Sequence, residues 1–256
     1  MVLGDGYINV RKRLNKGIYK YDSSEMRIVH SLAQKDYCIH KAGLVKKYLG
    51  GNFSVREYAS GPGGAYRCCG FSASNSYFKL IKKWLYPGGK KTITLHALEM
   101  LTDEGLALWY MDDGHARRNL NKDGYVSSVA TSIATMCSKE EIDTIISWFK
   151  ARYSVEWKPR YKKGSPEDKA WFIECNTENS RFFAHIVRPF IIDSMMYKLA
   201  HVADLTSHEC RAPVGKCTTC NGPLYDKRRG GLCGTCYSRR YYRDVRRFIE
   251  GRKPNR

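Results

Sequence analysis

The chain has 256 residues and carries 44 lysines and arginines against 25 acidic residues, a formal net charge of +19 with a predicted pI near 9.5. Hydrophobic residues make up 43% and aromatic residues 12%, which is enough to build a core and excludes a mainly disordered chain. The excess of positive charge favours a polyanionic partner.

The apolar runs are short. The longest run near the middle of the chain, Leu106–Met111, is far below the roughly 20 residues that cross a bilayer. The first ten residues lack the apolar region of a secretory signal. We therefore expect a soluble, non-secreted protein with no membrane partner, either cytoplasmic, as a bacterial or phage-encoded nucleoid-associated protein, or organellar. Six scattered cysteines are expected to be ordinary thiols: Cys38, Cys68, Cys69, Cys137, Cys175 and Cys210.

A long internal repeat covers the first 200 residues. The residues GDGY at 4–7 return as DDGH at 112–115, and NSYF at 75–78 returns as NSRF at 179–182. Helical patterns at Lys35–Leu49 and Lys139–Tyr153 correspond in the same order. Chance similarity is the alternative, but the agreement in order and spacing predicts two copies of one unit.

Alternating segments within each unit predict strands. They are Tyr7–Arg13, Met26–Ser31, Phe53–Tyr58 and Tyr66–Phe71, then Tyr125–Ile133, Val155–Tyr161 and Ala170–Cys175. With glycine-rich turns between them, the expected class is α+β, with the order αββαββα twice and antiparallel sheets rather than a parallel doubly wound sheet. The expected division is 1–100 for the first repeat, 101–204 for the second, and 205–256 for a linker and a basic module.

Two acidic residues lie at corresponding ends of apolar segments. The helical run from Leu106 stops at Asp113-Gly114, where glycine is expected to end the helix in the left-handed conformation. A carboxylate there opposes the helix dipole, so a divalent cation is a natural partner, and Asp5-Gly6 repeats the arrangement. The alternative is a simple Asp-Gly turn. A pseudo-twofold axis would bring Asp5 and Asp113 together, and such a pair with Mg²⁺ can activate water and stabilise the leaving oxygen of a phosphodiester.

The segment Leu106–Gly114 resembles the second motif of the monomeric, double-motif LAGLIDADG homing endonucleases, and Val2–Tyr7 resembles the end of a first motif. The resemblance covers about residues 1–199. Further stretches that resemble the group I intron branch are Trp84–Lys91, Leu101-Thr102, Pro189–Ile191 and Ser194–Leu199. It implies a monomer with a saddle of two four-stranded antiparallel sheets astride the major groove of double-stranded DNA, with the motif helices between them.

The resemblance also implies residue roles. Asp5 and Asp113 would bind Mg²⁺, or Mn²⁺ or Ca²⁺ in the same sites, with the backbone carbonyls of Gly4 and Asp112 as further ligands. Gln34 would order a water molecule. Lys90 or Lys91, and Lys198 in the second repeat, would lie near the scissile phosphates; for the first two, a solvated loop is the alternative. The second repeat has Met136–Ser138 where the glutamine would be expected, which suggests unequal cutting of the two strands.

Contacts to DNA are expected from the outward faces of the first strand of each unit, by base readout and by phosphate contact. The expected residues are Tyr7, Asn9, Arg11 and Arg13, then His115, Arg117 and Asn119. The alternative for the basic run at 11–13 is a solvated edge strand, which basic residues also protect from aggregation.

The C-terminal segment is a second basic module, with 12 basic and 3 acidic residues in 216–256. Two CxxC pairs, Cys217 with Cys220 and Cys233 with Cys236, have the spacing of a four-thiolate zinc site. The segment 237–251 is predicted to be a helix that makes a second DNA contact. Its arginines are Arg239, Arg240, Arg243, Arg246 and Arg247. Composition does not separate DNA from RNA or a protein partner here.

Three functions fit these patterns. The first is a metal-dependent, site-specific DNA endonuclease that promotes intron or gene homing. The second is a non-catalytic binder on the same scaffold, either an RNA maturase that assists splicing of intron RNA or a DNA-binding regulator. The third, a zinc-stabilised RNA-processing factor, depends on the tail alone. Retention of both Asp5 and Asp113 favours the endonuclease.

Overall fold

A computed structural model describes residues 3–15, 18–122, 126–166, 170–203, 215–221, 223–224, 232 and 236; side chains are not described for residues 11–23. The chain forms two compact units. One consists of residues 1–118 and 129–204 and contains nearly all of both repeats, and the other consists of 119–128 and 205–256. The predicted three-part division by residue ranges stays a prediction.

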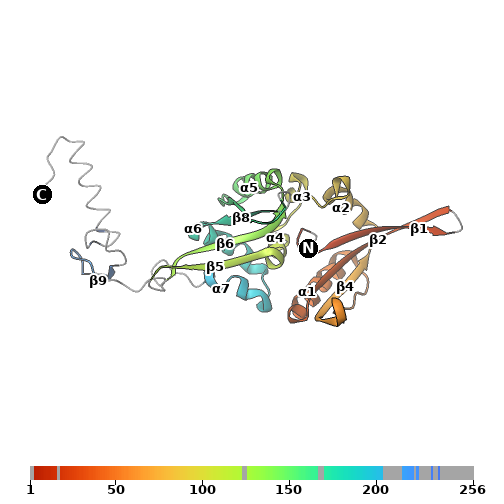
Figure 1. Ribbon diagram of the computed structural model, residues 1–256, viewed down its shortest axis with the longest axis horizontal. Helices are drawn as coiled ribbons and strands as arrows, with labels where there is room; N and C mark the ends of the chain where they lie inside the picture. The colour runs from red at the N-terminus through yellow and green to blue at the C-terminus, as the bar shows by residue number, and fades with distance from the viewer. Residues whose placement is uncertain are drawn as a thin grey trace. The chain divides into compact units, whose positions relative to one another are not determined.

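The first repeat folds as one antiparallel sheet with helices (Figure 1). Its elements are β1 (Tyr7–Asn15), β2 (Ile18–Ser31), α1 (Lys35–Leu49), β3 (Arg56–Ser60), β4 (Tyr66–Ser74) and α2 (Tyr77–Leu85). The strands lie in the order β1-β2-β4-β3. The described residues before β1, 3–5, form a turn, so no helix opens this repeat within the described part.

The second repeat follows a short helix, α3 (Leu95–Glu99). Its elements are α4 (Asp103–Asp113), β5 (Gly114–Leu120), β6 (Val126–Cys137), α5 (Lys139–Tyr153), β7 (Lys158–Tyr161), β8 (Trp171–Cys175), α6 (Thr177–Val187) and α7 (Ala200–Ala203). Its strand order, β5-β6-β8-β7, matches that of the first repeat. The predicted α+β class with two antiparallel sheets is confirmed.

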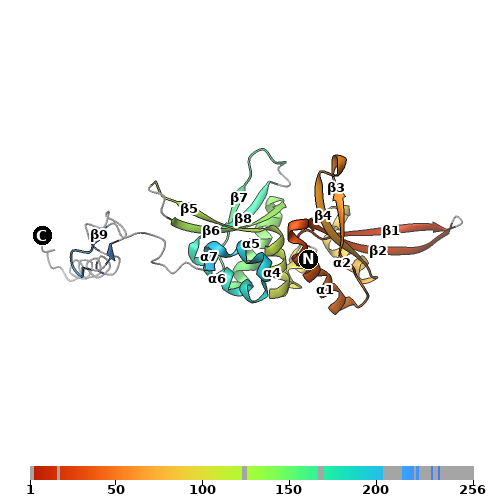
Figure 2. The ribbon, with the colours of Figure 1, turned by 90° about the horizontal axis from the view of Figure 1, so that it is seen from below.

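Each sheet has one face covered by helices and one open face (Figure 2). Alternation along the strands decides which side chains lie on which face. In the first repeat Ile8, Met26 and Ile28 are buried with residues of α1, whereas Tyr7 and Val29 are about half exposed. The open face of this sheet therefore carries the side chains of alternate strand residues such as Tyr7 and Val29.

Helix α4 is buried along most of its length and contacts both repeats. Residues 106–111 are at most 4% exposed. The side chain of Thr102 starts the helix by accepting from the N–H of Gly105. The hydroxyl of Tyr37 in α1 lies 3.0 Å from the carbonyl oxygen of Leu108, and the hydroxyl of Tyr110 donates to the carbonyl of Lys198. The apolar run thus forms the core between the repeats. Within the part of the chain that is described, no helix has the length and apolar character needed to cross a membrane.

The C-terminal module is described in part. Strands β9 (Gly215–Lys216) and β10 (Pro223–Leu224) form an antiparallel pair. The predicted helix at 237–251, including Arg239, Arg240, Arg243, Arg246 and Arg247, lies outside the described residues.

Candidate functional site

The ends of the two motifs touch each other. The backbone N–H of Asp5 donates to Oδ2 of Asp112 over 3.2 Å. A Cβ atom on Gly4 would lie 2.2 Å from the same oxygen, which is closer than side-chain carbons approach. Glycine at position 4 is therefore required for the end of the first motif to reach the second.

Helix α4 ends differently from the prediction. Gly114 has φ −80° and ψ 150°, so it is extended and starts β5 directly; the predicted left-handed glycine is wrong. A Cβ atom there would lie 2.0 Å from a ring carbon of Tyr110 and 2.3 Å from its carbonyl oxygen. Gly114 is needed for space, because the chain passes from helix to strand against the last turn.

The carboxylate of Asp112 is an internal anchor. Its side chain is 0% exposed, as is that of Lys41, and the two form an ion pair. The hydroxyl of Tyr37 donates to Asp112 Oδ1 over 2.9 Å. Because Tyr37 and Lys41 both belong to α1, this buried carboxylate ties the second motif to the first repeat.

His30 lies between Lys41 and Asp5 and contacts both. Lys41 Nζ lies 3.0 Å from Nε2 of His30. An ammonium can only donate, so Nε2 accepts and the ring proton of neutral His30 is on Nδ1. That atom is 3.5 Å from Oδ2 of Asp5, whose side chain is 42% exposed. Burial, and next the charge of Lys41, lower the pKa of His30, which keeps the ring neutral.

The carboxylates at the motif ends repel one another. Burial, and then the charges of Asp112 and Asp5, raise the pKa of Asp113 to about 7. Burial and the charge of Asp112 also raise the pKa of Asp5. A divalent cation would offset this repulsion, so the residues present fit the metal that the motif implies.

The motif predicts Asp5 and Asp113 as the carboxylate ligands of that metal. Among the described residues, Asp5, His30 and Asp112 bring one ligand atom each within 4.8 Å of one another. However, the ammonium of Lys41 contacts both His30 and Asp112, and a second cation there would be repelled. The side chain of Asp112 is therefore committed to Lys41.

Two lysines occupy matching positions at the motif ends. Lys91 Nζ donates to the carbonyl oxygen of Gly4 over 2.7 Å. Lys198 Nζ donates to the carbonyl oxygens of Asp112 and Gly114 over 3.3 and 2.7 Å. Burial lowers the pKa of both lysines. Lys90 is exposed, whereas Lys91 contacts the end of the first motif.

Gln34 also lies beside Asp5. It precedes α1, and with Asp5 and His30 it lines an open pocket of about 510 Å³. Its Nε2 donates to the hydroxyl of Tyr197 over 3.4 Å. In the second repeat the corresponding stretch contains Met136, which has φ 49° and is 48% exposed. The first repeat thus has the glutamine amide at this position, and the second repeat has no glutamine in the corresponding stretch.

The predicted DNA-contacting residues lie on the open faces where their side chains are described. Tyr7, Asn9, His115 and Arg117 alternate with the buried Ile8 and Ala116. Asn119 donates to the hydroxyl of Ser128 over 2.9 Å. Arg11 and Arg13 belong to β1, but their side chains lie outside the described part.

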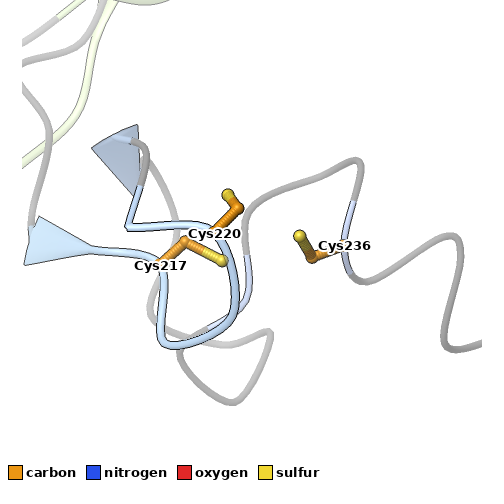
Figure 3. A group of neighbouring side chains, drawn as sticks. All are labelled: Cys217, Cys220 and Cys236. Carbon is orange, nitrogen blue, oxygen red and sulfur yellow. The ribbon is translucent and has the colours of Figure 1, made fainter.

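Three of the four predicted zinc ligands come together. The Sγ atoms of Cys217, Cys220 and Cys236 lie within 4.8 Å of one another (Figure 3). The N–H of Asn221 donates to the carbonyl of Cys217 over 2.9 Å, which closes a tight turn around the first pair. Cys233 lies outside the described residues. In the repeats, Cys38, Cys69, Cys137 and Cys175 are buried free thiols, as expected, and Cys68 is a half-buried one.

Sequence reasoning missed Tyr37, Lys41 and His30. Lys41 lies on the buried stripe of α1 with Tyr37, Cys38, Ala42 and Val45. His30 alternates along its strand in step with Met26 and Ile28, so its side chain lies on the same buried face. The available signal was a polar side chain at a core position of each pattern, Lys41 in the helix and His30 in the strand. Asp112, the partner of Lys41, was considered only for its carbonyl.

Comparisons with known proteins agree with this geometry. The homing endonuclease I-WcaI, solved bound to its DNA recognition sequence, has the same fold with a TM-score of 0.60 and 21% identity, over 77% of this chain and 81% of that chain. A probable intron-encoded endonuclease of Wickerhamomyces canadensis is 23% identical over 202 residues, 77% of this chain and 80% of the relative.

A third relative is the cytochrome b mRNA maturase bI2 of Saccharomyces cerevisiae, which is 28% identical over 208 residues, 78% of this chain. The chain spans less than half of that maturase, 45% of its length. Residues 1–183, which include both motif ends and both sheets, match the LAGLIDADG DNA endonuclease family. This match covers well over half of the sequence and agrees with the fold and with the meeting of the motif ends: the chain belongs to the LAGLIDADG DNA endonuclease family.

Proposed function

We propose that this protein is a site-specific DNA endonuclease that hydrolyses phosphodiester bonds in a long double-stranded target and so promotes homing of an intron or gene. The observation that carries the proposal is the meeting of the two motif ends, where Asp5 and Asp113 are crowded by like charges and flanked by Lys91 and Lys198. The protein acts as a monomer, because both halves of the site come from one chain.

Asp5 and Asp113 would hold the divalent metal, with the carbonyl oxygens of Gly4 and Asp112 as further ligands. The metal, Mg²⁺ in this proposal, would supply an activated water and stabilise the leaving oxygen. Lys91 and Lys198 now donate to those carbonyls. Each ammonium would have to release its carbonyl before a metal binds there, because the two cations repel each other. The released ammonium groups would then offset the negative charge of a nearby phosphate.

The chain's own asymmetry supports unequal cutting. Gln34 and His30 lie beside Asp5, where Gln34 can orient a water molecule and His30 can hold the carboxylate. The second repeat has Met136 in the stretch that corresponds to Gln34. We expect one strand to be cut faster than the other.

A pool of double-stranded DNA with a randomised segment tests the activity. The full chain is incubated with the pool in Mg²⁺, and the ends of the products are mapped on each strand, with EDTA as the control. Cuts at one recurring sequence, absent in EDTA, support the proposal. Products without sequence preference, or the same products in EDTA, would overturn it.

The maturase relative favours a second function, assistance to intron splicing by binding intron RNA. The two functions are compatible on one chain. A filter-binding comparison of structured intron RNA with duplex DNA of equal length separates the functions. Stronger binding of RNA, with no cleavage of DNA, favours the maturase. Binding of duplex DNA without cleavage favours a regulator.

The C-terminal module is proposed to bind one Zn²⁺ through Cys217, Cys220, Cys233 and Cys236 and to add a second DNA contact through its basic segment. The three described thiols fit zinc because thiolates are its preferred ligands and their Sγ atoms already converge. Removal of residues 205–256 should weaken DNA binding and flatten its salt dependence. Unchanged affinity would contradict the DNA contact. The compartment, cytoplasmic or organellar, stays a prediction.

A further inference from the structure

A carboxylate lies on the open face of the second sheet, where positive charge is expected. Glu174 follows the fully buried Ile173 in β8, so it points to the opposite face from the helices. It is paired with Ser132 of β6 on one side and Lys158 of β7 on the other. Its side chain is nevertheless only 8% exposed.

Two arginines cover it. Arg117 Nη2 of β5 donates to Oε2 over 2.7 Å, and Arg160 Nε of β7 donates to Oε1 over 2.9 Å. Each oxygen thus binds a different arginine, and the three residues join the first and last strands of the sheet across its open face. Both arginines remain half exposed, at 53% and 51%.

Glu174 fixes the orientation of the two arginines while occupying only some of their N–H donors. A guanidinium has five N–H donors in one plane, and Glu174 accepts only one or two from each arginine. The remaining donors are held in a defined orientation on the exposed side. An arginine whose plane is already fixed loses less entropy when it binds a second planar partner.

The negative charge of Glu174 opposes the attraction of this group to DNA phosphates. Glu174 lowers the charge of the group from two positive charges to one, so it weakens sequence-independent binding. A fixed guanidinium instead suits the edge of guanine, whose O6 and N7 accept two parallel hydrogen bonds in the major groove.

We propose that Glu174 is a specificity-determining positioning residue: it orients Arg117 and Arg160 to read guanines in the half of the DNA site that the second repeat binds, and it reduces binding to other DNA. The inference depends on the proposed DNA recognition. The first repeat offers a matched control, because Glu25 accepts from Arg27 over 3.0 Å on the open face of β2.

The test is selection of bound sequences from a randomised duplex DNA library in EDTA, using the full-length wild type, Glu174→Gln, Glu174→Asp and Glu25→Gln. Glutamine keeps the size and one acceptor oxygen but removes the charge. We expect Glu174→Gln to lose about tenfold of base preference at a short run of positions in one half of the site. It should bind the unselected library more tightly, with a salt slope steeper by about one. Glu174→Asp should retain part of the preference, and Glu25→Gln should change only the other half.

Folding is checked by thermal unfolding of each variant. A merely structural role for Glu174 would weaken binding to every sequence alike, and that result would overturn the proposal. So would a site preference identical to that of the wild type. A wild-type protein that enriches no sequence would overturn the proposed DNA recognition itself, and the role of Glu174 with it.

Discussion

The buried pair of Lys41 and Asp112 allows a quantitative test of how the repeats are joined. Both side chains are 0% exposed, so replacement of Lys41 by methionine keeps the length and the apolar stem but leaves a buried carboxylate without its cation. The other described donors to the Asp112 carboxylate are neutral, the Tyr37 hydroxyl and the Asp5 N–H. Loss of one partner of such a pair costs about 3–5 kcal/mol. We expect Lys41→Met to lower the free energy of unfolding by that amount.

A second lysine provides the control. Lys35 Nζ lies 2.7 Å from Glu57 Oε1, but these side chains are 46% and 39% exposed. Solvent screens that pair, so Lys35→Met should cost only about 0.2–1 kcal/mol. The two substitutions are chemically identical and lie in the same helix, and the two ion pairs differ strongly in burial.

Urea unfolding followed by tryptophan fluorescence measures both, since all five tryptophans lie between Trp84 and Trp171, in the repeats. Asp112→Asn in the Lys41→Met background should recover at least half of the loss, because it removes the orphaned charge and leaves Tyr37 a partner. If Lys41→Met costs no more than Lys35→Met, the pair does not anchor the repeats.

Three further predictions concern the motif ends and the tail. Gly4→Ala should destabilise by about 1–3 kcal/mol and reduce cleavage, because the new methyl group meets Asp112 at 2.2 Å. Gly43→Ala, where nothing lies within 4 Å, should stabilise slightly, and the same unfolding assay compares them. In the metal-free protein, the stability contributed by the Asp113 proton should be lost as pH rises from about 4 to 7, because the folded state holds that proton up to a pKa of about 7 against an ordinary 3.8. Asp113→Asn should therefore stabilise it by about 4 kcal/mol at pH 8 and roughly 2 at pH 5 in EDTA, and an equal gain at both would contradict the shifted pKa. Mass spectrometry should find about one zinc per wild-type chain and far less in Cys236→Ser, with Cys68→Ser unchanged; full zinc in Cys236→Ser would exclude it as a ligand.

Much of the fold could be predicted from local patterns. The helices Lys35–Leu49 and Lys139–Tyr153 have the predicted bounds, because apolar periodicity and flanking turn residues agree there. Strand bounds were less exact: β2 begins at Ile18 rather than Met26, because polar residues before Met26 pair with β1 outside the alternating segment. Pairing across a hairpin supplies hydrogen bonds that hydrophobic alternation does not report.

The site was only partly predictable. Repetition of Asp5 and Asp113 at corresponding places identified the motif ends, because repeat position is visible in sequence. The contacts of Asp112 with Lys41, and of Glu174 with Arg117, join residues far apart in the chain, and no local pattern couples them. The extended conformation of Gly114 also depends on the close approach of Tyr110, which a helix-ending glycine alone does not reveal.

Strand-resolved cleavage by single variants tests the central claim most directly. Duplex DNA containing the selected target is incubated in Mg²⁺ with the wild type, Asp5→Asn or Asp113→Asn, and each strand is labelled separately. We expect the wild type to cut both strands at one position each, and both variants to lose double-strand cleavage while still binding the target. Double-strand cleavage at the wild-type rate by either variant would show that the two motif carboxylates do not form the active site.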